Sequence, residues 1–302
     1  MGDPTLLAVA LVLDAALGEP AWLWSRLPHP AVLMGHAVDV LDRRLNQGRA
    51  RRAKGVLALA VLLAGSITAG ALIATLPAPF EAVAAAILLA QRSLVDHVSA
   101  VATALREGLG SGRAAVARIV GRDTAAMDGP AVARAAIESA AENLSDGVVA
   151  PAFWFLVGGL PGLVAYKAVN TADSMIGHRT PRHEAFGWAA ARLDDILNWI
   201  PARLTAALIL LVHGGLPEWR KVAADARLHR SPNAGWPEAA LARVLGVAVS
   251  GPRSYGGRLT EFPWVNGEGR RAAGPEDIEH AVRALWRCWA ALLALAVALA
   301  VA

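Results

Sequence analysis

The chain has 302 residues, of which 55% are hydrophobic and only 18% are charged, and its mean hydropathy is +0.42. This balance excludes a disordered or fibrous chain and is too apolar for an ordinary soluble domain of this length. A net charge of +4 would suit a nucleic-acid ligand, but the basic residues cluster beside apolar blocks, most densely between Arg43 and Lys54. Charge on the cytoplasmic side of a membrane explains that clustering better. We therefore expect a multi-pass protein of the cell membrane that contacts lipid and binds no nucleic acid.

The first long apolar segments predict a membrane hairpin. The segment from Gly55 to Leu76 carries no charge and is long enough to cross a hydrocarbon core of about 30 Å as a helix. After a proline-containing turn, the segment from Glu81 to Gln91 would span only if it continued past Arg92 toward Val101. Together the two segments then form a helical hairpin.

The other apolar segments are shorter or interrupted. Thr5–Gly18 contains Asp14, and a charge within an apolar helix indicates function. Gly147–Tyr166 is uncharged but broken by glycines and a proline, so half-helices or a re-entrant loop fit it as well as a straight span. With Leu204–Pro217 and Leu285–Ala302, we expect an all-α polytopic membrane protein of about five to seven membrane segments. We treat residues 1–302 as a single membrane-embedded domain, because the sequence has no visible repeat or linker.

Polar stretches between these segments hold nearly all the carboxylates, and we expect them to be helical. In the first, a helix should begin at Pro130 and carry Glu138, Glu142 and, if the helix continues, Asp146 at i, i+4 spacing on one face. Like charges stacked in this way repel, and Mg²⁺ bridged to phosphate oxygens would neutralise them. A solvated acidic face is the alternative. The alanine-rich helix before these residues and the apolar segment after them favour the cation.

The second polar stretch carries donors and acceptors at the edge of an apolar segment. Lys167, Asn170 and Ser174 share a helix face, with Asp173 beside it. This arrangement suits phosphate and metal binding, and a polar helix start with a snorkelling lysine is the alternative.

The same stretch ends in a third acidic cluster. Asp194 and Asn198 lie one helical turn apart, and Arg192 and Arg203 flank them. An Asp-Asp pair followed by Asn suits Mg²⁺-diphosphate, although such a pair is also common on exposed helices. The motif is weak by itself and becomes informative because two other polar clusters accompany it.

Two further segments have the composition of ligand-binding loops. Arg122 and Asp123 lie at the tip of a predicted turn, and Ser231 and Asn233 lie in a loop that also carries cations, as an anion or an amide-bearing substrate would require. The sequence contains neither HExxH nor GxxxxGK[ST]. We therefore assign no histidine metal site, and any ATP would bind outside a P-loop.

Several long strings resemble the cobinamide-phosphate synthases of the cobalamin pathway, a family called CobD or CbiB. The resemblance runs in order from the first helix to about Gly256 and is weakest from Tyr255 to Arg271. The matching strings are Leu13–Pro20, His29-Pro30, Arg92–Leu94 with His97, Val120–Thr124, Glu138–Pro151, Tyr166–Gly177, Phe186–Arg203 and Ser231–Glu238.

The resemblance implies an ATP-dependent amide-bond-forming ligase. Such an enzyme joins the f-side-chain carboxylate of adenosylcobyric acid to (R)-1-amino-2-propanol O-phosphate, or to aminopropanol itself. ATP and Mg²⁺ are the implied cofactors, and an acyl phosphate is the expected intermediate. The active loops are expected on the cytoplasmic side of the membrane.

The chemistry of that reaction suggests a role for each candidate residue. Asp123 or Glu138 would accept the amine proton, and Lys167, Arg122 and Arg203 would bind phosphate groups. The metal ligands, or residues that support them, are Glu142, Asp146, Asp173 and Asp194. The predicted catalytic residues are Asp123, Glu138, Lys167, Asn170 and Ser174, and the predicted cofactor-binding residues are Arg122, Asn143, Asn198, Arg203, Ser231 and Asn233.

Three other functions stay open at this point. Two aspartate-bearing helices in an all-helical membrane protein could hold Mg²⁺-diphosphate in a prenyltransferase. The broken segment Gly158–Gly162, together with Asp14, would suit a transporter. A corrinoid-binding protein without catalysis is the third, but it leaves the clustered carboxylates unexplained.

Overall fold

The computed structural model describes residues 2–255 and 258–302; Gly256, where the resemblance ends, lies outside the described residues. The chain divides into two compact units, each built from discontinuous segments. Unit 1 comprises Met1–Ala90, Ala150–Asn198 and Leu295–Ala302, and unit 2 comprises Gln91–Val149 and Trp199–Ala294. The prediction of a single domain stays a prediction.

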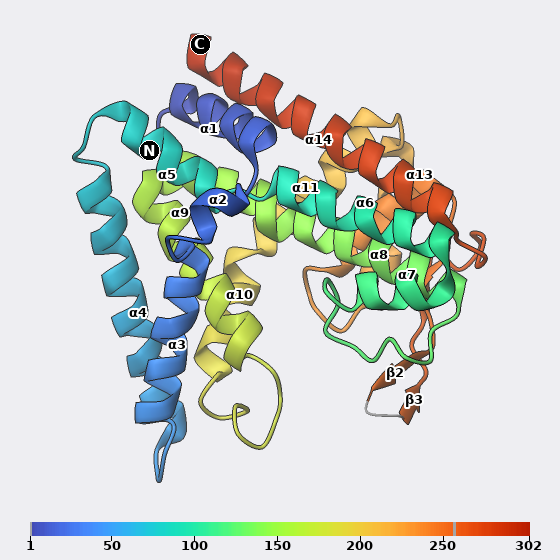
Figure 1. The fold of residues 1–302 in the computed structure, drawn as a ribbon, viewed down its shortest axis with the longest axis horizontal. Helices are drawn as coiled ribbons and strands as arrows, with labels where there is room; N and C mark the ends of the chain where they lie inside the picture. The colour runs from blue at the N-terminus through green and yellow to red at the C-terminus, as the bar shows by residue number, and fades with distance from the viewer. Residues whose placement is uncertain (1, 256–257) are drawn as a thin grey trace. The chain divides into compact units, whose positions relative to one another are not determined.

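Helices make up most of both units (Figure 1). Unit 1 contains α1 (Pro4–Leu17), α2 (Ala21–Trp24), α3 (Pro30–Leu45), α4 (Arg51–Ile73), α5 (Ala78–Leu88), α9 (Ala150–Ile176) and α10 (Trp188–Leu197). Unit 2 contains α6 (Gln91–Glu107), α7 (Leu109–Val116), α8 (Gly129–Leu144), the π-helical turn η1 (Ser145–Val149), α11 (Trp199–Val212), the 3₁₀ turn η2 (Leu216–Glu218), α12 (Trp219–Ala226) and α13 (Gly235–Leu245). The long helix α14 (Pro275–Val301) begins in unit 2 and ends in unit 1.

Four helical segments among the described residues are long and apolar enough to cross a membrane: Arg51–Ile73, Ala78–Glu107, Gly129–Ile176 and Pro275–Val301. A fifth results if α10 and α11, which are bent by 42° at a short break, are counted as one span. The predicted all-α polytopic fold is confirmed, and the number of spans reaches only the lower end of the expected five to seven. The second segment does continue past Arg92, as a membrane hairpin requires.

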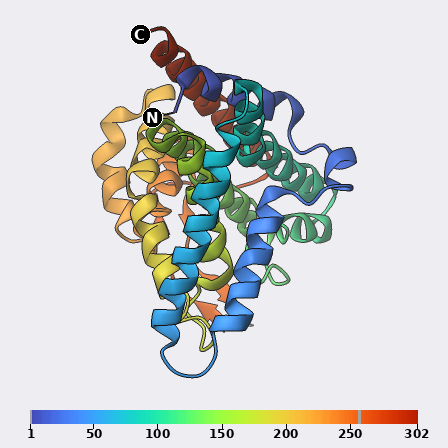
Figure 2. The ribbon, with the colours of Figure 1, turned by 90° about the vertical axis from the view of Figure 1, so that its left-hand side faces the viewer.

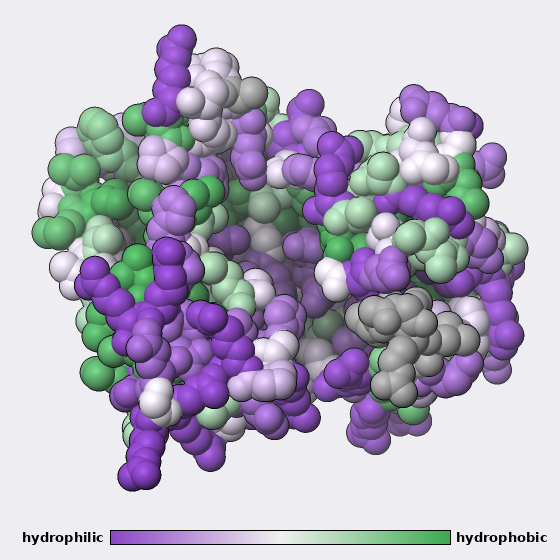
Figure 3. Space-filling view, turned by 60° about the horizontal axis from the view of Figure 1, so that its bottom comes forward, coloured by the Kyte–Doolittle hydropathy of each residue, from purple (hydrophilic) through white to green (hydrophobic). Residues whose placement is uncertain are grey.

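The membrane helix α4 has two different faces. Its inner face carries small residues and packs against α9, and Leu62 and Ala58 share a buried core with Ala168 and Ala172 of that helix. Its outer face exposes large apolar side chains such as Leu57 and Leu72. Figure 2 shows α4 beside α3, joined by the turn at their lower end. Figure 3 shows hydrophilic residues gathered over the lower left of the molecule and hydrophobic residues on the flank above them.

Replacing Gly70 with valine should loosen the packing of α4 on α9. A Cβ atom at this glycine would lie 2.7 Å from the Cα of Pro161, which is backbone and cannot rotate away. Overpacking of this kind costs about 1–3 kcal/mol. Gly65→Val is the matched control, because a Cβ atom there meets nothing within 4 Å. Thermal unfolding in detergent should show a lower midpoint for Gly70→Val than for Gly65→Val, and equal midpoints would contradict the close packing.

The interrupted apolar segment forms two helical halves. Gly159 has φ 63° and ψ −162°, so it breaks α9 between them, and only glycine adopts such angles readily. Pro161, two residues later, lacks a backbone N–H donor where the helix is already open. The predicted break is therefore present at Gly159.

Unit 2 also contains short strands, which correct the expectation that the polar stretches are helical throughout. They form two antiparallel pairs: β1 (Val249–Ser250) with β4 (Trp264–Val265), and β2 (Arg253–Tyr255) with β3 (Arg258–Thr260). Helix α8 packs against α6, α13 and β1. The chain after α13 is thereby brought to the middle of α8, far from it in sequence.

Candidate functional site

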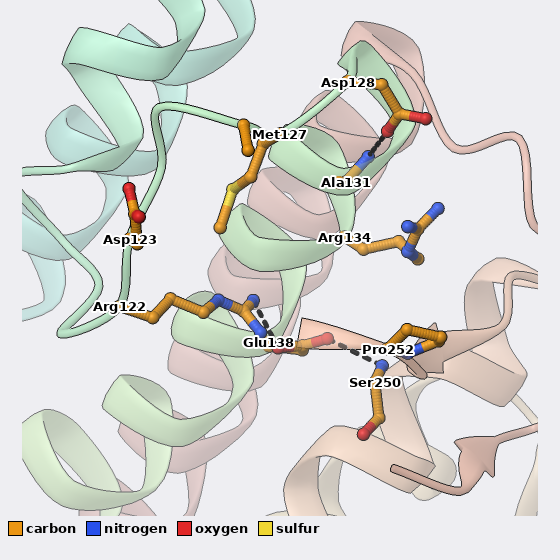
Figure 4. A pocket seen from close by; sticks show the side chains of 10 residues that line it. Arg122, Asp123, Met127, Asp128, Ala131, Arg134, Glu138, Ser250 and Pro252 are labelled. Atoms are coloured by element: carbon orange, nitrogen blue, oxygen red, sulfur yellow. Dashed lines mark hydrogen bonds and ion pairs between the residues drawn. The ribbon is translucent and has the colours of Figure 1, made fainter. Parts of the chain in front are cut away.

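A polar cavity of about 270 Å³ in unit 2 is lined by the start of α8, the loop before it and the chain around β1 (Figure 4). Helix α8 begins after Asp128, whose carboxylate accepts a hydrogen bond from the Ala131 N–H at 2.8 Å. This cap satisfies a backbone donor that the helix leaves without a partner. The helix start predicted at Pro130 is confirmed to within one residue. The cavity brings together three predicted site residues: Arg122, Asp123 and Glu138.

Glu138 is the centre of a buried polar contact in this cavity. Its Oε2 accepts a hydrogen bond from the Arg122 guanidinium at 2.7 Å, and the two side chains are only 7% and 9% exposed. Its Oε1 accepts from the backbone N–H of Ser250 at 2.7 Å. Ser250 has φ 64°, a conformation that costs free energy for a residue with a side chain. The spacing of carboxylates predicted Mg²⁺ as the neutralising charge for Glu138, whereas in the structure Arg122 neutralises it.

Asp123 is in a different environment from Glu138. The residue is exposed, and its carboxylate accepts the N–H of Ala125 at 3.0 Å. Figure 4 places it on the loop beside the cavity, across from α8. Of the two predicted proton acceptors, Asp123 is therefore the more accessible.

Arg134 also lines the cavity and was not among the predicted site residues. It lies one helical turn before Glu138 on α8, and its Nη1 donates to the backbone oxygen of Arg271 at 2.8 Å. As the one charged residue between Asp128 and Glu138 in an alanine-rich helix, it carried a signal that could have identified it.

The end of α8 differs from a regular helix. Asn143 donates to the backbone oxygen of Ser139 at 2.8 Å, and the Ser139 hydroxyl donates to the backbone oxygen of Ile119 at 2.8 Å. Glu142 is exposed, whereas Asp146 is partly buried within the π turn η1. The i, i+4 spacing on a regular α-helix therefore holds for Glu138 and Glu142 but does not extend to Asp146, because a π turn has a wider hydrogen-bond repeat.

Unit 1 contains a second polar cluster, between α9 and α10. Asp194 accepts hydrogen bonds from Asn198 at 3.0 Å and Asn170 at 3.3 Å. The hydroxyl of Tyr166 donates to the Asn198 side-chain oxygen at 2.9 Å, and both Tyr166 and Asn198 are buried. Asp173 is close enough for its charge to act on Asp194. Four predicted residues, Asn170, Asp173, Asp194 and Asn198, thus come together, while Tyr166 was missed.

Lys167 and Ser174 lie on the same helix as Asn170 and Asp173, α9. The Ser174 hydroxyl donates to the backbone oxygen of Asn170 at 2.9 Å, one turn earlier in α9. Lys167 is partly buried. Burial lowers the pKa of His29, the charge of Glu19 opposes this, and the charge of Lys167 adds to the lowering. The lysine therefore lies near His29, at the start of α3.

The third predicted group lies in unit 2, around Arg203. The guanidinium donates to the side-chain oxygen of Asn233 at 3.2 Å and lies over the rings of Trp199 and Trp236, 4.5 and 4.7 Å from their centroids. The Ser231 hydroxyl accepts the N–H of Asn233 at 3.2 Å. Arg203, Ser231 and Asn233 therefore form one group in which the arginine is held by aromatic and amide contacts.

The predicted metal ligands are divided between the units: Glu142 and Asp146 belong to unit 2, and Asp173 and Asp194 belong to unit 1. Within residues 2–255 and 258–302, no group of three or more His, Cys, Asp or Glu side chains is placed to hold a metal ion. Mg²⁺ commonly binds through one or two carboxylates together with substrate phosphates and water. The Asp173 and Asp194 carboxylates, which repel each other, fit that requirement.

The chain is similar over most of its length to known proteins. A family model described as "CobD/Cbib protein" matches residues 7–285. The cobalamin biosynthesis protein CobD of Rhizobium meliloti (strain 1021) is 52% identical to it, covering 92% of this chain and 90% of the relative. The proteins of the same name from Brucella suis biovar 1 (strain 1330) and Rhodobacter capsulatus are 49% and 50% identical, covering 97% and 88% of this chain and 95% and 88% of the relatives. No solved structure matches. The chain therefore belongs to the CobD/CbiB family of cobalamin biosynthesis proteins.

Proposed function

We propose that this membrane protein is an ATP-dependent ligase that forms adenosylcobinamide phosphate. It would join the f-side-chain carboxylate of adenosylcobyric acid to (R)-1-amino-2-propanol O-phosphate, or to the unphosphorylated aminopropanol. Membership of a cobalamin biosynthesis family over nearly the whole chain carries the proposal. The polar cavity with paired acidic and basic side chains supports it, since an amide-forming site needs both.

The reaction would proceed through an acyl phosphate intermediate. The corrinoid carboxylate oxygen attacks the γ-phosphorus of ATP and releases ADP. The amine nitrogen then attacks the activated carbonyl carbon, phosphate leaves, and the proton of the amine passes to a base. The protein acts by holding the reactants and their charges in position.

Residues in unit 2 would handle the amine and its proton. Asp123 is the proton acceptor in this proposal, because it is exposed beside the cavity and both oxygens of Glu138 already accept hydrogen bonds from the protein. Glu138 instead positions Arg122. Arg203, with Ser231 and Asn233 around it, would contact a phosphate or amide group of a substrate.

Residues in unit 1 would hold Mg²⁺, which supplies charge neutralisation for the transferring phosphate. Asp194 is oriented by Asn170 and Asn198, and Asp173 adds a second carboxylate. In unit 2, Glu142 and Asp146 are the other proposed ligands.

The basic turn between α3 and α4 supports a location in the cell membrane with that turn on the cytoplasmic side. Six basic residues lie at the end of α3, in the turn and at the start of the apolar span α4: Arg43, Arg44, Arg49, Arg51, Arg52 and Lys54. Short loops rich in Lys and Arg stay on the cytoplasmic side.

The direct test is a mass-spectrometric assay of detergent-purified protein given adenosylcobyric acid, aminopropanol phosphate and Mg²⁺-ATP. We expect the adenosylcobinamide phosphate mass to appear with an equal amount of ADP. Omission of any one component, including Mg²⁺, should abolish both products. ADP without the corrinoid product would mean uncoupled hydrolysis. Folded protein that makes neither product and instead consumes an isoprenoid diphosphate would refute the proposal.

A further inference from the structure

Arg134 is the basic residue lining the unit 2 cavity to which the proposed reaction gives no role. Within the described part of the chain it forms no ion pair with an acidic side chain. Among the described residues, its one hydrogen bond is donated to the backbone oxygen of Arg271. A guanidinium carries five N–H donors, so donors remain for a ligand in the cavity that it lines.

An aromatic ring helps to hold this guanidinium. Arg134 lies over the ring of Trp264, with its Cζ 5.2 Å from the centroid, and Arg271 lies over the same ring at 4.6 Å. The contact with the Trp264 ring and the hydrogen bond to the backbone of Arg271 together restrict the rotation of the Arg134 side chain. A positioned guanidinium loses less conformational entropy when it binds an anion.

The lining of the cavity carries charges of both signs. Arg134 lies on α8 and Arg122 on the loop before it, and Arg122 is already engaged with Glu138 (Figure 4). Asp123 and Asp128 lie along the loop that closes it. A ligand that matches this lining carries both an anionic group and an ammonium group.

The size of the cavity limits the ligand further. Pockets for drug-sized molecules measure about 300–1,000 Å³, and this one is about 270 Å³. A phosphorylated amino alcohol of a few carbon atoms fits within that volume, whereas a corrinoid would extend far beyond it.

We propose that Arg134 binds the phosphate of a phosphorylated amino alcohol in this cavity and so selects it over the unphosphorylated amine. The inference rests on the proposed function, because it assigns one of the two substrates of that reaction to a place in unit 2. Arg134 donates to phosphate oxygens, while the ammonium end of the substrate faces Asp123. On this basis Arg134 determines specificity and takes no part in the proton transfer.

The test compares two amines in the wild type and in Arg134→Gln. We expect the KM for aminopropanol phosphate to rise about 10- to 100-fold, the loss typical of a hydrogen bond to a charged group. The KM for aminopropanol should stay unchanged, because that substrate has no phosphate. Arg134→Lys keeps the charge but lacks the planar guanidinium, so its KM for aminopropanol phosphate should lie between those of the wild type and Arg134→Gln. Arg118→Gln is the matched control, since it removes an equal charge from an exposed site of unit 2.

Calorimetric binding of aminopropanol phosphate to the same proteins, without ATP or corrinoid, separates the inference from the proposed function. Tighter binding to the wild type than to folded Arg134→Gln supports the inference even if no product forms, in which case the ligase proposal alone fails. Equal binding by both proteins overturns the inference. An equal rise of the KM for both amines also overturns it, because the arginine would then act on structure or general charge.

Discussion

Replacing Glu138 with glutamine is expected to lower the free energy of unfolding by about 3–5 kcal/mol, which is the usual effect of removing one partner from a buried ion pair. Glutamine keeps the shape of the side chain and can still accept the N–H of Ser250, which now bonds to Oε1. It cannot neutralise Arg122, whose side chain is only 9% exposed. The guanidinium would remain desolvated without an opposite charge.

The double variant provides the control for this effect. Arg122→Gln with Glu138→Gln removes both charges, so its loss of stability should be smaller than the sum of the two single losses by about 0.5–3 kcal/mol. Denaturant unfolding in detergent micelles measures all three variants. Strictly additive losses would mean that Arg122 and Glu138 do not depend on each other, contrary to the 2.7 Å contact between them.

Replacing Asp194 with asparagine is expected to lower kcat/KM by more than about 100-fold, since changes in the residues that only orient a metal ligand already cost about 10- to 100-fold. The Asn170 and Asn198 amides both donate to this carboxylate. An asparagine at this position loses the negative charge that would bind Mg²⁺, while its size is unchanged. Asn198→Ala should show the smaller loss of about 10- to 100-fold, partly restored by raising the Mg²⁺ concentration.

The neighbouring aspartate is the matched control for this prediction. Asp195 pairs instead with Arg192 at 3.0 Å on the same helix, and a surface pair of this kind contributes at most about 1 kcal/mol. Asp195→Asn should therefore retain nearly full activity. Equal losses in the two variants, or full activity in Asp194→Asn, would remove Asp194 from the metal site.

Local features of the fold could be predicted from the sequence. The uncharged segment from Gly55 to Leu76 became α4, Asp128 capped α8, and the glycine cluster broke α9 at Gly159. Each depends on residues within a few positions of one another. A helix cap, a missing donor or a left-handed glycine acts on its own turn, so spacing along the chain is enough to identify it.

The contacts that the site residues make with one another could not be predicted from the sequence. The sequence singled out Arg122 and Glu138 but assigned them to different ligands, although they pair with each other. Ser250 and Tyr166 were missed, because each meets its partner through a contact between elements distant in sequence. The π turn at Asp146 was not predicted either, because the sequence pattern left open whether the regular helix continues that far.

The sequence by itself determined that this is a helical membrane protein, which residues are candidates for its chemistry, and the family to which it belongs. Only the tertiary structure decided that Glu138 is neutralised by Arg122, that Asp194 is held by two asparagines, and that Arg134 is left to face a small polar cavity. The physical reason is that hydrophobic spacing and capping act over one or two helical turns. The pairing of buried charges instead depends on how the faces of separate helices pack, and spacing along the chain does not record it.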